Sequence, residues 1–342
     1  MLGLEGPELS VEEQEMLRHP LVGGVILFAR NYREPEQVAL LAETIHSLRH
    51  PHLLVAVDHE GGRVQRFRED FTRLPAVRRL GEIHDGDPAR ALRLARVTGW
   101  LMAAELRAVG VDFSFAPILD LDRGVSGVIG DRAFHGDPET VASLAHAYIG
   151  GMQQAGMKAV GKHFPGHGGV AADSHQELPV DERPLADIAA ADLLPFERMI
   201  HYGLAGVMPA HVVYSQVDSQ PAGFSIRWLR DILRNRLGFQ GAVFSDDLDM
   251  AGAAGAGAPP ERARAALAAG CDMVLVCNDR QAAVAVLNGL QNPADPVAQL
   301  RLARLHGRGH LTPQRLPADP AWRQAVRLVQ DYDAVPVLDL DI

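Results

Sequence analysis

The chain has few cysteines, and this shortage already limits what it can be. Its 342 residues include only two, Cys271 and Cys277. They flank the apolar run DMVLV, and in an extended strand they would lie about 20 Å apart at roughly 3.3 Å per residue. That separation is too large for a disulfide. We therefore expect two buried thiols in a protein of a reducing compartment.

The sequence also lacks a long hydrophobic run and an excess of basic residues. No stretch approaches the roughly 18 apolar residues of a membrane-spanning helix. The first residues, MLGLEGPELS, have neither the basic start nor the apolar core of a secretion signal. The formal net charge of −10 argues against a nucleic-acid or anionic-membrane surface. These absences predict a cytoplasmic protein that binds neither nucleic acid nor membrane.

A repeated unit stands out in what remains: a helical pattern ends at a glycine, and an apolar strand follows within a few residues. Such strands follow Gly110, Gly156, Gly203, Gly238 and Gly270. Glycine adopts the left-handed conformation after a helix at little cost. The strands are continuously apolar, which is typical of parallel strands buried on both faces. The pattern favours an α/β fold with parallel strands.

Two helix starts are marked by an aspartate followed by proline, at Asp87-Pro88 and Asp137-Pro138, a favourable N-cap and first helical residue. Further strands are expected near 1–4, 25–28 and 53–57. The alternation predicts a single (β/α)8 TIM-type barrel. The main alternative is a doubly wound open sheet.

We expect the barrel to span about residues 1–290 and a C-terminal helical extension, about 291–342, to pack on it within one catalytic domain. A lone barrel of this kind also favours a monomer. The small-residue stretch AGAAGAGAPP at 251–260 reads as a loop because it is too short for a linker.

Polar side chains gather directly after the predicted strands. The densest group is KHFPGHGGVAADSH at 162–175, with a lysine, three histidines and an aspartate. Others contain Asp58, His59, Glu60, Arg63, Arg66, Asp120, Asp122, Arg132, His211, Asp246, Asp247 and Asp249. Because the C-terminal ends of barrel strands meet at one mouth, we expect these groups to form one site. Asp120 and Asp122 could equally be structural ion-pair partners, and His211 a hydrogen-bonded wall residue.

No metal or nucleotide signature accompanies these clusters. His163 and His167 are four residues apart, but Pro165 and Gly166 lie between them, which excludes a pair of zinc ligands on one helix. No glycine-rich phosphate loop of familiar spacing precedes a helix. The sequence therefore predicts neither a metal nor a cofactor.

Four motifs, in order along the chain, resemble glycoside hydrolase family 3. They are DHEGGRVQR at 58–66, IGDRAF at 129–134, KHFPGHG at 162–168 with ADSH at 172–175, and FSDDLDM at 244–250. Within the family the chain is similar to the small single-barrel β-N-acetylglucosaminidases of bacterial peptidoglycan recycling. The resemblance implies a retaining exo-β-N-acetylglucosaminidase that removes terminal GlcNAc from muropeptides such as GlcNAc-1,6-anhydro-MurNAc peptides.

The resemblance also implies roles for individual residues. Asp246 matches the nucleophile that forms a covalent glycosyl–enzyme. His175 matches the general acid/base, and Asp173 would orient its imidazole. The positions that match the family's sugar-binding residues are Asp58, Arg66, Arg132, Lys162 and His163. Larger members carry a glutamate acid on an added C-terminal domain, so we expect this chain to draw its acid from the barrel.

Three other functions remain open at this point. A phosphorylase of the same family would intercept the same intermediate with phosphate. A metal-dependent hydrolase would use His163, His167, Asp173 and His175 as ligands. A catalytically inactive sugar-binding barrel is the third, although the retained Asp246, Asp173 and His175 argue against it.

Overall fold

Two four-stranded parallel sheets form the centre of the molecule. The computed structural model describes residues 1–174, 176–291, 295–309 and 312–333. The first sheet has the order β1 (Leu2–Gly3), β2 (Gly24–Leu27), β3 (Leu54–Val57) and β6 (Phe113–Ser114). The second has the order β7 (Val160–Phe164), β9 (Gly206–Pro209), β11 (Ala242–Asp247) and β12 (Met273–Leu275).

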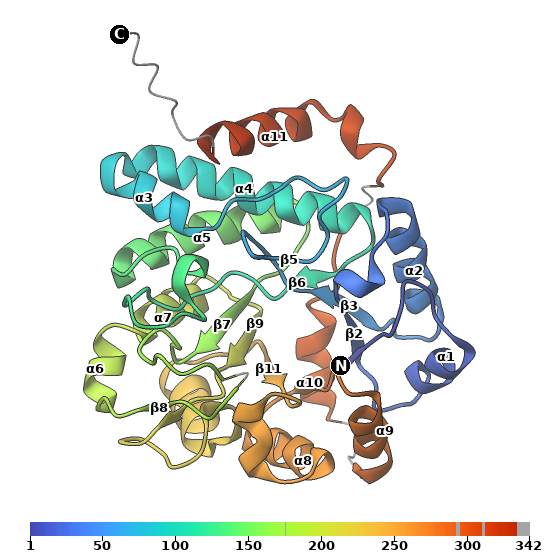
Figure 1. Ribbon diagram of the computed structural model, residues 1–342, viewed down its shortest axis with the longest axis vertical. Coiled ribbons are helices and arrows are strands. Elements are labelled where there is room, and N and C mark those ends of the chain that lie inside the picture. The colour runs from blue at the N-terminus through green and yellow to red at the C-terminus, as the bar shows by residue number, and fades with distance from the viewer. Residues whose placement is uncertain (175, 292–294, 310–311, 334–342) are drawn as a thin grey trace.

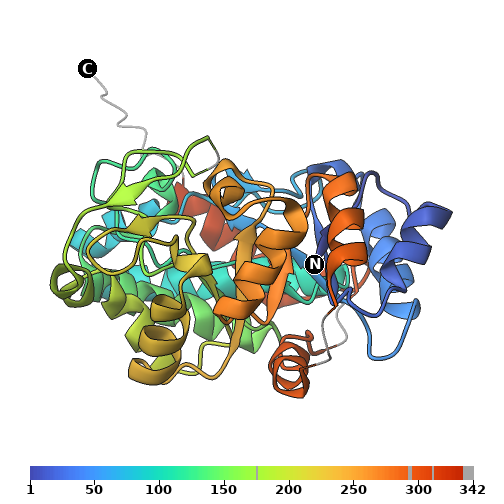
Figure 2. The ribbon, with the colours of Figure 1, turned by 90° about the horizontal axis from the view of Figure 1, so that it is seen from below.

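The two sheets meet at both of their ends. Isolated parallel bridges join Ile118 to Lys162 and Leu2 to Val276. The Val276 amide also donates to the Met1 carbonyl at 3.1 Å, and Figure 2 places the N-terminus between the first and last segments of the alternating strand–helix pattern. Both sheets, as described, follow chain order, whereas a doubly wound sheet reverses its order at a switch point. The expected α/β class with parallel strands is confirmed.

Helices surround these strands (Figure 1). They are α1 (Val11–Leu17), α2 (Pro35–Ser47), α3 (Arg78–Gly86), α4 (Pro88–Ala108), α5 (Pro138–Gln154), α6 (Leu185–Ala190), α7 (Leu193–His201), α8 (Pro259–Ala269), α9 (Arg280–Gly289), α10 (Pro296–Ala303) and α11 (Pro320–Asp333), with a π-type helix at Arg227–Arg236. Asp87 caps α4 by accepting the Arg90 amide at 2.9 Å. Asp137 caps α5 by accepting the Thr140 amide at 2.8 Å. Both helix starts therefore lie where the aspartate–proline pairs predict them.

Shorter strands and 3-10 turns lie between the main strands and helices. They are the antiparallel hairpin β4 (His59–Gly61) and β5 (Val64–Gln65), the parallel pair β8 (Val180–Asp181) and β10 (Val213–Tyr214), and 3-10 turns at Ala29–Asn31, Gly130–Arg132, Ala222–Phe224, Ala251–Ala256 and Leu316–Ala318. The stretch expected as a loop at 251–260 is thus a 3-10 turn followed by the start of α8.

Aromatic side chains fill the space between the two sheets. The rings of Phe113 and Phe115 lie 5.2 Å apart, and each lies within 5.5 Å of the Phe244 ring. Phe113 belongs to β6 and Phe244 to β11, so one core joins both sheets. Cys271 and Cys277 are buried and form no disulfide, as the sequence indicates. Among the described helices, none combines the length and the apolar character needed to cross a bilayer.

Helix α11 lies along α4 (Figure 1). The Trp322 indole donates to the Glu105 carboxylate at 2.9 Å, and the hydroxyls of Tyr332 and Thr98 lie 3.2 Å apart. Glu105 is buried, and its carboxylate also accepts from the Thr72 amide and hydroxyl. Burial raises the pKa of Glu105. The C-terminal helix is therefore joined to α4 by buried polar contacts as well as by apolar packing.

Candidate active site

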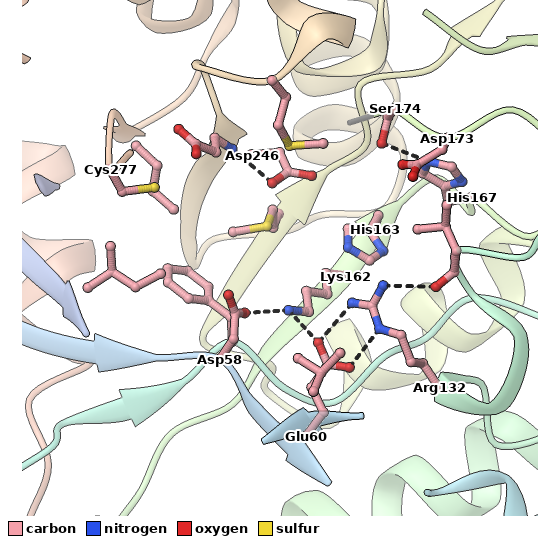
Figure 3. Close-up of a pocket in the computed structure, with 18 of the residues that line it drawn as sticks. Asp58, Glu60, Arg132, Lys162, His163, His167, Asp173, Ser174, Asp246 and Cys277 are labelled. Atoms are coloured by element: carbon pink, nitrogen blue, oxygen red, sulfur yellow. Dashed lines mark hydrogen bonds and ion pairs between the residues drawn. The ribbon is translucent and has the colours of Figure 1, made fainter. Parts of the chain in front are cut away.

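One cavity of about 870 Å³ opens where the strands end, a size suited to a small ligand. Among the residues that line it are the predicted site residues Asp58, Arg66, Arg132, Lys162, His163, Asp173 and Asp246. Figure 3 shows most of these side chains around one space. The predicted acid/base, His175, lies outside the described residues. Segments far apart in the sequence therefore converge on one site, as strand-end chemistry in an α/β fold predicts.

Two of these side chains lie at irregularities in the parallel strands. The register of β7 against β9 shifts between Lys162 and Phe164, which brackets His163. The register of β11 against β12 shifts between Phe244 and Asp247, which brackets Asp246. A local bulge changes the direction in which a side chain points and is common beside functional sites. The irregularities thus present His163 and Asp246 to the cavity.

Four charged side chains form a continuous network on one side of the cavity (Figure 3). The Lys162 ammonium lies 2.7 Å from both Asp58 and Glu60. Glu60 in turn receives two hydrogen bonds from the Arg132 guanidinium, each 2.8 Å long. Arg66 lies 3.6 Å from the second oxygen of Asp58. We call Asp58, Glu60, Arg132 and Lys162 the charge network.

The opposite charges of the charge network offset the cost of burial and keep its members ionised. Burial would raise the pKa of Glu60, but Arg132 and Lys162 hold it well below its usual range. Burial would lower the pKa of Lys162, but Asp58 and Glu60 raise it. Near neutral pH, Glu60 and Lys162 therefore stay charged. Ionised donors and acceptors in fixed positions make strong hydrogen bonds to hydroxyl groups, so this side of the cavity suits a polyhydroxylated ligand.

A buried aspartate orients His163. Asp120 lies 2.7 Å from the His163 Nδ1, and its carboxylate also accepts from the His163 backbone amide at 3.2 Å. A carboxylate can only accept, so Nδ1 carries a proton and donates it to Asp120, which fixes the orientation of the ring. Burial would raise the pKa of Asp120, but His163 lowers it. Asp120 is thus a structural partner, one of the two readings that its sequence position allows.

Asp246 has the ionisation state that a nucleophile needs. Its side chain is half-buried and accepts the Asp247 amide at 2.8 Å. Burial would raise the pKa of Asp246, but the nearby His211 and His163 lower it. The His211 side chain is buried, and its Nε2 donates to the Asp247 carbonyl at 3.1 Å. The carboxylate therefore faces the cavity as an anion, able to attack an electrophilic carbon.

Asp173 reaches the same cavity from the segment that follows β7. Its carboxylate accepts from the Gln176 side-chain amide at 3.2 Å, and its backbone carbonyl accepts from the Gln176 and Glu177 amides. These bonds start a turn directly after Asp173. The arrangement places a carboxylate across the cavity from the charge network, in the same space as Asp246.

Comparison with known proteins identifies the family. The model of the Glycosyl hydrolase family 3 N terminal domain matches residues 2–305. The chain belongs to glycoside hydrolase family 3. A relative from Thioalkalivibrio sulfidiphilus (strain HL-EbGR7), named beta-hexosaminidase, is 61% identical over 342 residues, 100% of this chain and 98% of that protein.

Solved structures of this family agree with the match. NagZ from Neisseria gonorrhoeae, in complex with N-trifluoroacetyl-D-glucosamine, is 47% identical with a TM-score of 0.93, covering 98% of this chain and 97% of that one. A family 3 beta-N-acetylglucosaminidase from Paenibacillus sp. str. FPU-7 is 31% identical with a TM-score of 0.82, covering 99% of this chain and 62% of that one. The resemblance seen in the motifs is confirmed, and the chain is a glycoside hydrolase of the β-hexosaminidase type.

Sequence reasoning did not select Glu60, His167 or Ser174 as site residues of this family 3 enzyme, although all three line the cavity. Glu60 stands next to Asp58 in the DHEGGR motif, and a glutamate inside a continuous strand-end motif has to be paired if it is buried. His167 belongs to KHFPGHG. Ser174 separates Asp173 from His175 and carries no charge, so nothing in its residue type marks it.

The described part of the chain holds no group of three or more His, Cys, Asp or Glu side chains placed to bind a metal ion. His163 and His167 lie with ring centres 5.9 Å apart and face different partners, Asp120 and Ser174. The described residues of the metal-dependent alternative therefore do not converge on one point.

Proposed function

We propose that this enzyme is a retaining exo-β-N-acetylglucosaminidase of peptidoglycan recycling, with GlcNAc-1,6-anhydro-MurNAc peptides as substrates. The observation that carries the proposal is the ionised Asp246 at the end of β11, in one cavity with the charge network and Asp173. A retaining glycosidase needs a carboxylate below the sugar ring and a proton donor beside the leaving oxygen. The site offers Asp246 for the first role.

In the first step, an oxygen of Asp246 bonds to the anomeric carbon while the bond to the leaving oxygen breaks. His175 gives that oxygen a proton, so the aglycone leaves as a neutral alcohol. Asp173 accepts a hydrogen bond from the imidazole and supports its charged form. The products of this step are a glycosyl ester on Asp246 and a neutral imidazole.

In the second step, the neutral imidazole takes a proton from water, and the water oxygen bonds to the anomeric carbon as the bond to Asp246 breaks. The nucleophile and the acid/base return to their starting forms. Two displacements at one carbon restore the original configuration, so the sugar leaves with net retention.

The charge network, together with Arg66 and His163, would bind the hydroxyls of the terminal sugar. Asp58 and Glu60 supply acceptors, and Arg132 and Lys162 supply donors. The His163 Nε2 adds a further hydrogen-bonding atom, because Asp120 engages only its Nδ1. The complex of the similar NagZ with N-trifluoroacetyl-D-glucosamine supports an N-acylated glucosamine as the ring that binds here.

The proposal includes the architecture and setting of the enzyme. We infer one catalytic domain in which the eight strands form a (β/α)8 barrel, supported by the bridges that join the two sheets at both ends. A monomer in the cytoplasm, without cofactor or metal, fits the expectations drawn from the sequence.

The test is identification of the covalent intermediate. The enzyme is incubated with a 5-fluoro GlcNAc trapping reagent and digested, and the labelled peptide is sequenced by mass spectrometry. We expect the label on Asp246, and nuclear magnetic resonance of the first product to show the β-anomer. A label on another residue, or the α-anomer as first product, would refute the mechanism.

Hydrolysis is favoured over phosphorolysis because the similar proteins carry hydrolase names. Turnover of a GlcNAc glycoside with and without phosphate separates the two reactions, since only a phosphorylase makes the sugar phosphate. Full activity after exhaustive chelation would remove the metal-dependent alternative in the same assay.

A further inference from the structure

Ser174 is held differently from its neighbours in the chain. It lies between Asp173 and His175, and it is 2% exposed. Among the other described residues of 171–178, none is buried. A single buried side chain in an otherwise accessible segment marks the point at which that segment is attached to the protein.

Two hydrogen bonds make this attachment. The Ser174 hydroxyl lies 3.1 Å from the His167 Nε2, as the dashed line in Figure 3 shows. The Ser174 carbonyl accepts the Gly252 amide at 3.0 Å. The first partner belongs to the segment after β7, and the second to the 3-10 turn after β11. We call these two contacts the Ser174 clamp.

Both partners of the clamp are themselves fixed. The His167 backbone amide donates to Asp120 at 2.7 Å, and the same carboxylate orients His163. The His167 side chain is buried, and its pKa is lowered by burial and by His163. The imidazole is therefore neutral near pH 7 and forms a neutral hydrogen bond with the hydroxyl.

Gly252 fits its place because it lacks a side chain. A Cβ at this position would lie 2.9 Å from the His211 Cβ and 3.1 Å from the Ser174 carbonyl oxygen. Both distances are shorter than ordinary van der Waals contacts, so any larger residue would have to displace His211, the Ser174 carbonyl or both. The 3-10 turn thus sets how closely the Ser174 backbone approaches the nucleophile strand.

We propose that Ser174 is a positioning residue for proton transfer: the clamp from His167 and Gly252 fixes the backbone that carries Asp173, and so sets where Asp173 stands relative to Asp246. Asp173 is the proposed partner of the acid/base His175, and Ser174 shares a peptide bond with Asp173. The inference rests on the proposed acid/base role of that pair. Small misplacements of a catalytic group cost large factors in rate, so two hydrogen bonds here have a disproportionate effect.

The test uses leaving groups that differ in their need for a proton. A dinitrophenyl GlcNAc glycoside leaves without protonation, whereas an alkyl GlcNAc glycoside requires it. We expect Ser174→Ala to lower kcat/KM for the alkyl glycoside by about tenfold or more, part of the roughly 10²–10⁴-fold contribution of acid catalysis. The dinitrophenyl glycoside should change by less than about twofold, because the attack of Asp246 is untouched. Ser174→Thr keeps the hydroxyl and should restore most of the loss.

A second variant tests the other half of the clamp. Gly252→Ala places a methyl group against the Ser174 carbonyl and should show the same selective loss on the alkyl glycoside. Gly255→Ala is the matched control, since its Cβ would meet no atom within 4 Å. It lies in the same 3-10 turn and should behave as wild type on both substrates.

His175→Ala separates failure of this inference from failure of the proposed function. If His175→Ala lowers kcat/KM equally for the alkyl and the dinitrophenyl glycoside, the acid/base assignment is wrong. If His175→Ala shows the selective loss while Ser174→Ala affects both substrates equally or neither, the clamp is refuted and the assignment stands. Far-UV circular dichroism of each variant identifies any general loss of folding.

Discussion

The two sides of the cavity are built in opposite ways. On one side, the charge network places four charged side chains at strand ends, and three of them expose less than a tenth of their side chain: Glu60 at 6%, Lys162 at 4% and Arg132 at 9%. On the other side, the described residues of 171–178 are exposed or partly buried apart from Ser174, which the clamp attaches. The first side is held by ion pairs between buried side chains, and the second includes the hydrogen bonds of the Ser174 clamp.

From this difference we expect one side of the cavity to serve binding and the other to serve proton transfer. A buried, fully paired network holds its geometry whatever occupies the cavity, which suits recognition of a fixed pattern of hydroxyls. The accessible segment carries Asp173, whose proposed role is in proton transfer, so substitutions there should act on rate. Substitutions on the two sides should therefore separate into effects on stability and binding and effects on turnover.

The largest effect is expected at Asp246, which belongs to neither side. Asp246→Ala removes the carboxylate that we propose as the nucleophile, so turnover should fall on the order of 10⁴-fold. GlcNAc binding, measured by calorimetry, should persist because the charge network is intact. Turnover close to wild type in this variant would end the nucleophile assignment.

On the network side, Glu60→Ala leaves Lys162 and Arg132 without a shared partner. Removing one member of a buried ion pair costs about 3–5 kcal/mol, and urea unfolding should show a loss of this size. As a control, Glu139→Ala breaks the exposed pair with Arg198, whose side chains are 58% and 53% exposed. That change should leave the free energy of unfolding within error of wild type, because exposed ion pairs contribute little. Equal losses in the two variants would contradict the rigid-network interpretation.

On the segment side, Asp173→Asn should lower kcat for an alkyl GlcNAc glycoside by about tenfold to a hundredfold, since an imidazole without its carboxylate partner is a poorer acid/base. The midpoint of urea unfolding should stay within error of wild type, because Asp173 is only partly buried. If Asp173→Asn instead lowers stability and leaves kcat unchanged, the proposed separation between binding on one side and proton transfer on the other is wrong.

The smallest effect concerns pH and stability. The folded-state pKa of Glu60 is depressed, so its ionisation stabilises the fold above the unfolded pKa of about 4.3, and this contribution is lost as pH falls through the folded-state pKa. Between about pH 5 and pH 3, wild type should therefore lose more unfolding free energy than Glu60→Gln. The comparison is made by urea unfolding at both pH values. Equal losses of unfolding free energy in wild type and Glu60→Gln would show that ionised Glu60 does not stabilise the fold through the charge network.

The sequence predicted the main elements because their signals are local. Continuous apolar runs located β2, β3, β7, β9, β11 and β12 to within a few residues, and Asp87 and Asp137 located two helix starts. Helix α3 was missed because its nine residues offer only two large apolar side chains, Leu80 and Ile83, which is too few to show a helical period. The β4–β5 hairpin was missed because its strands are too short to show a period.

Seven of the predicted site residues line one cavity because the motifs place them at strand ends, where the fold gathers them. Glu60 was named as a strand-end group but not as a site residue, because its importance depends on pairing with Arg132 and Lys162. These two residues lie 72 and 102 positions further along the chain and meet Glu60 only in three dimensions. Ser174 matters through its backbone and one hydroxyl, a role that no residue type reveals. Pairing and attachment are properties of the fold rather than of any local pattern.

The bond between Trp322 and Glu105 has a practical consequence for anyone who shortens the chain. Thr72, which shares the Glu105 carboxylate, also accepts from the Gln65 side chain, and Gln65 precedes Arg66. Trimming the protein before α11 would remove the cover from the buried Glu105 carboxylate, which is connected through Thr72 and Gln65 to the neighbour of Arg66, a residue that lines the cavity. A shortened enzyme made for crystallisation or inhibitor screening would thus carry a disturbed pocket, even though the cut is made on its far surface.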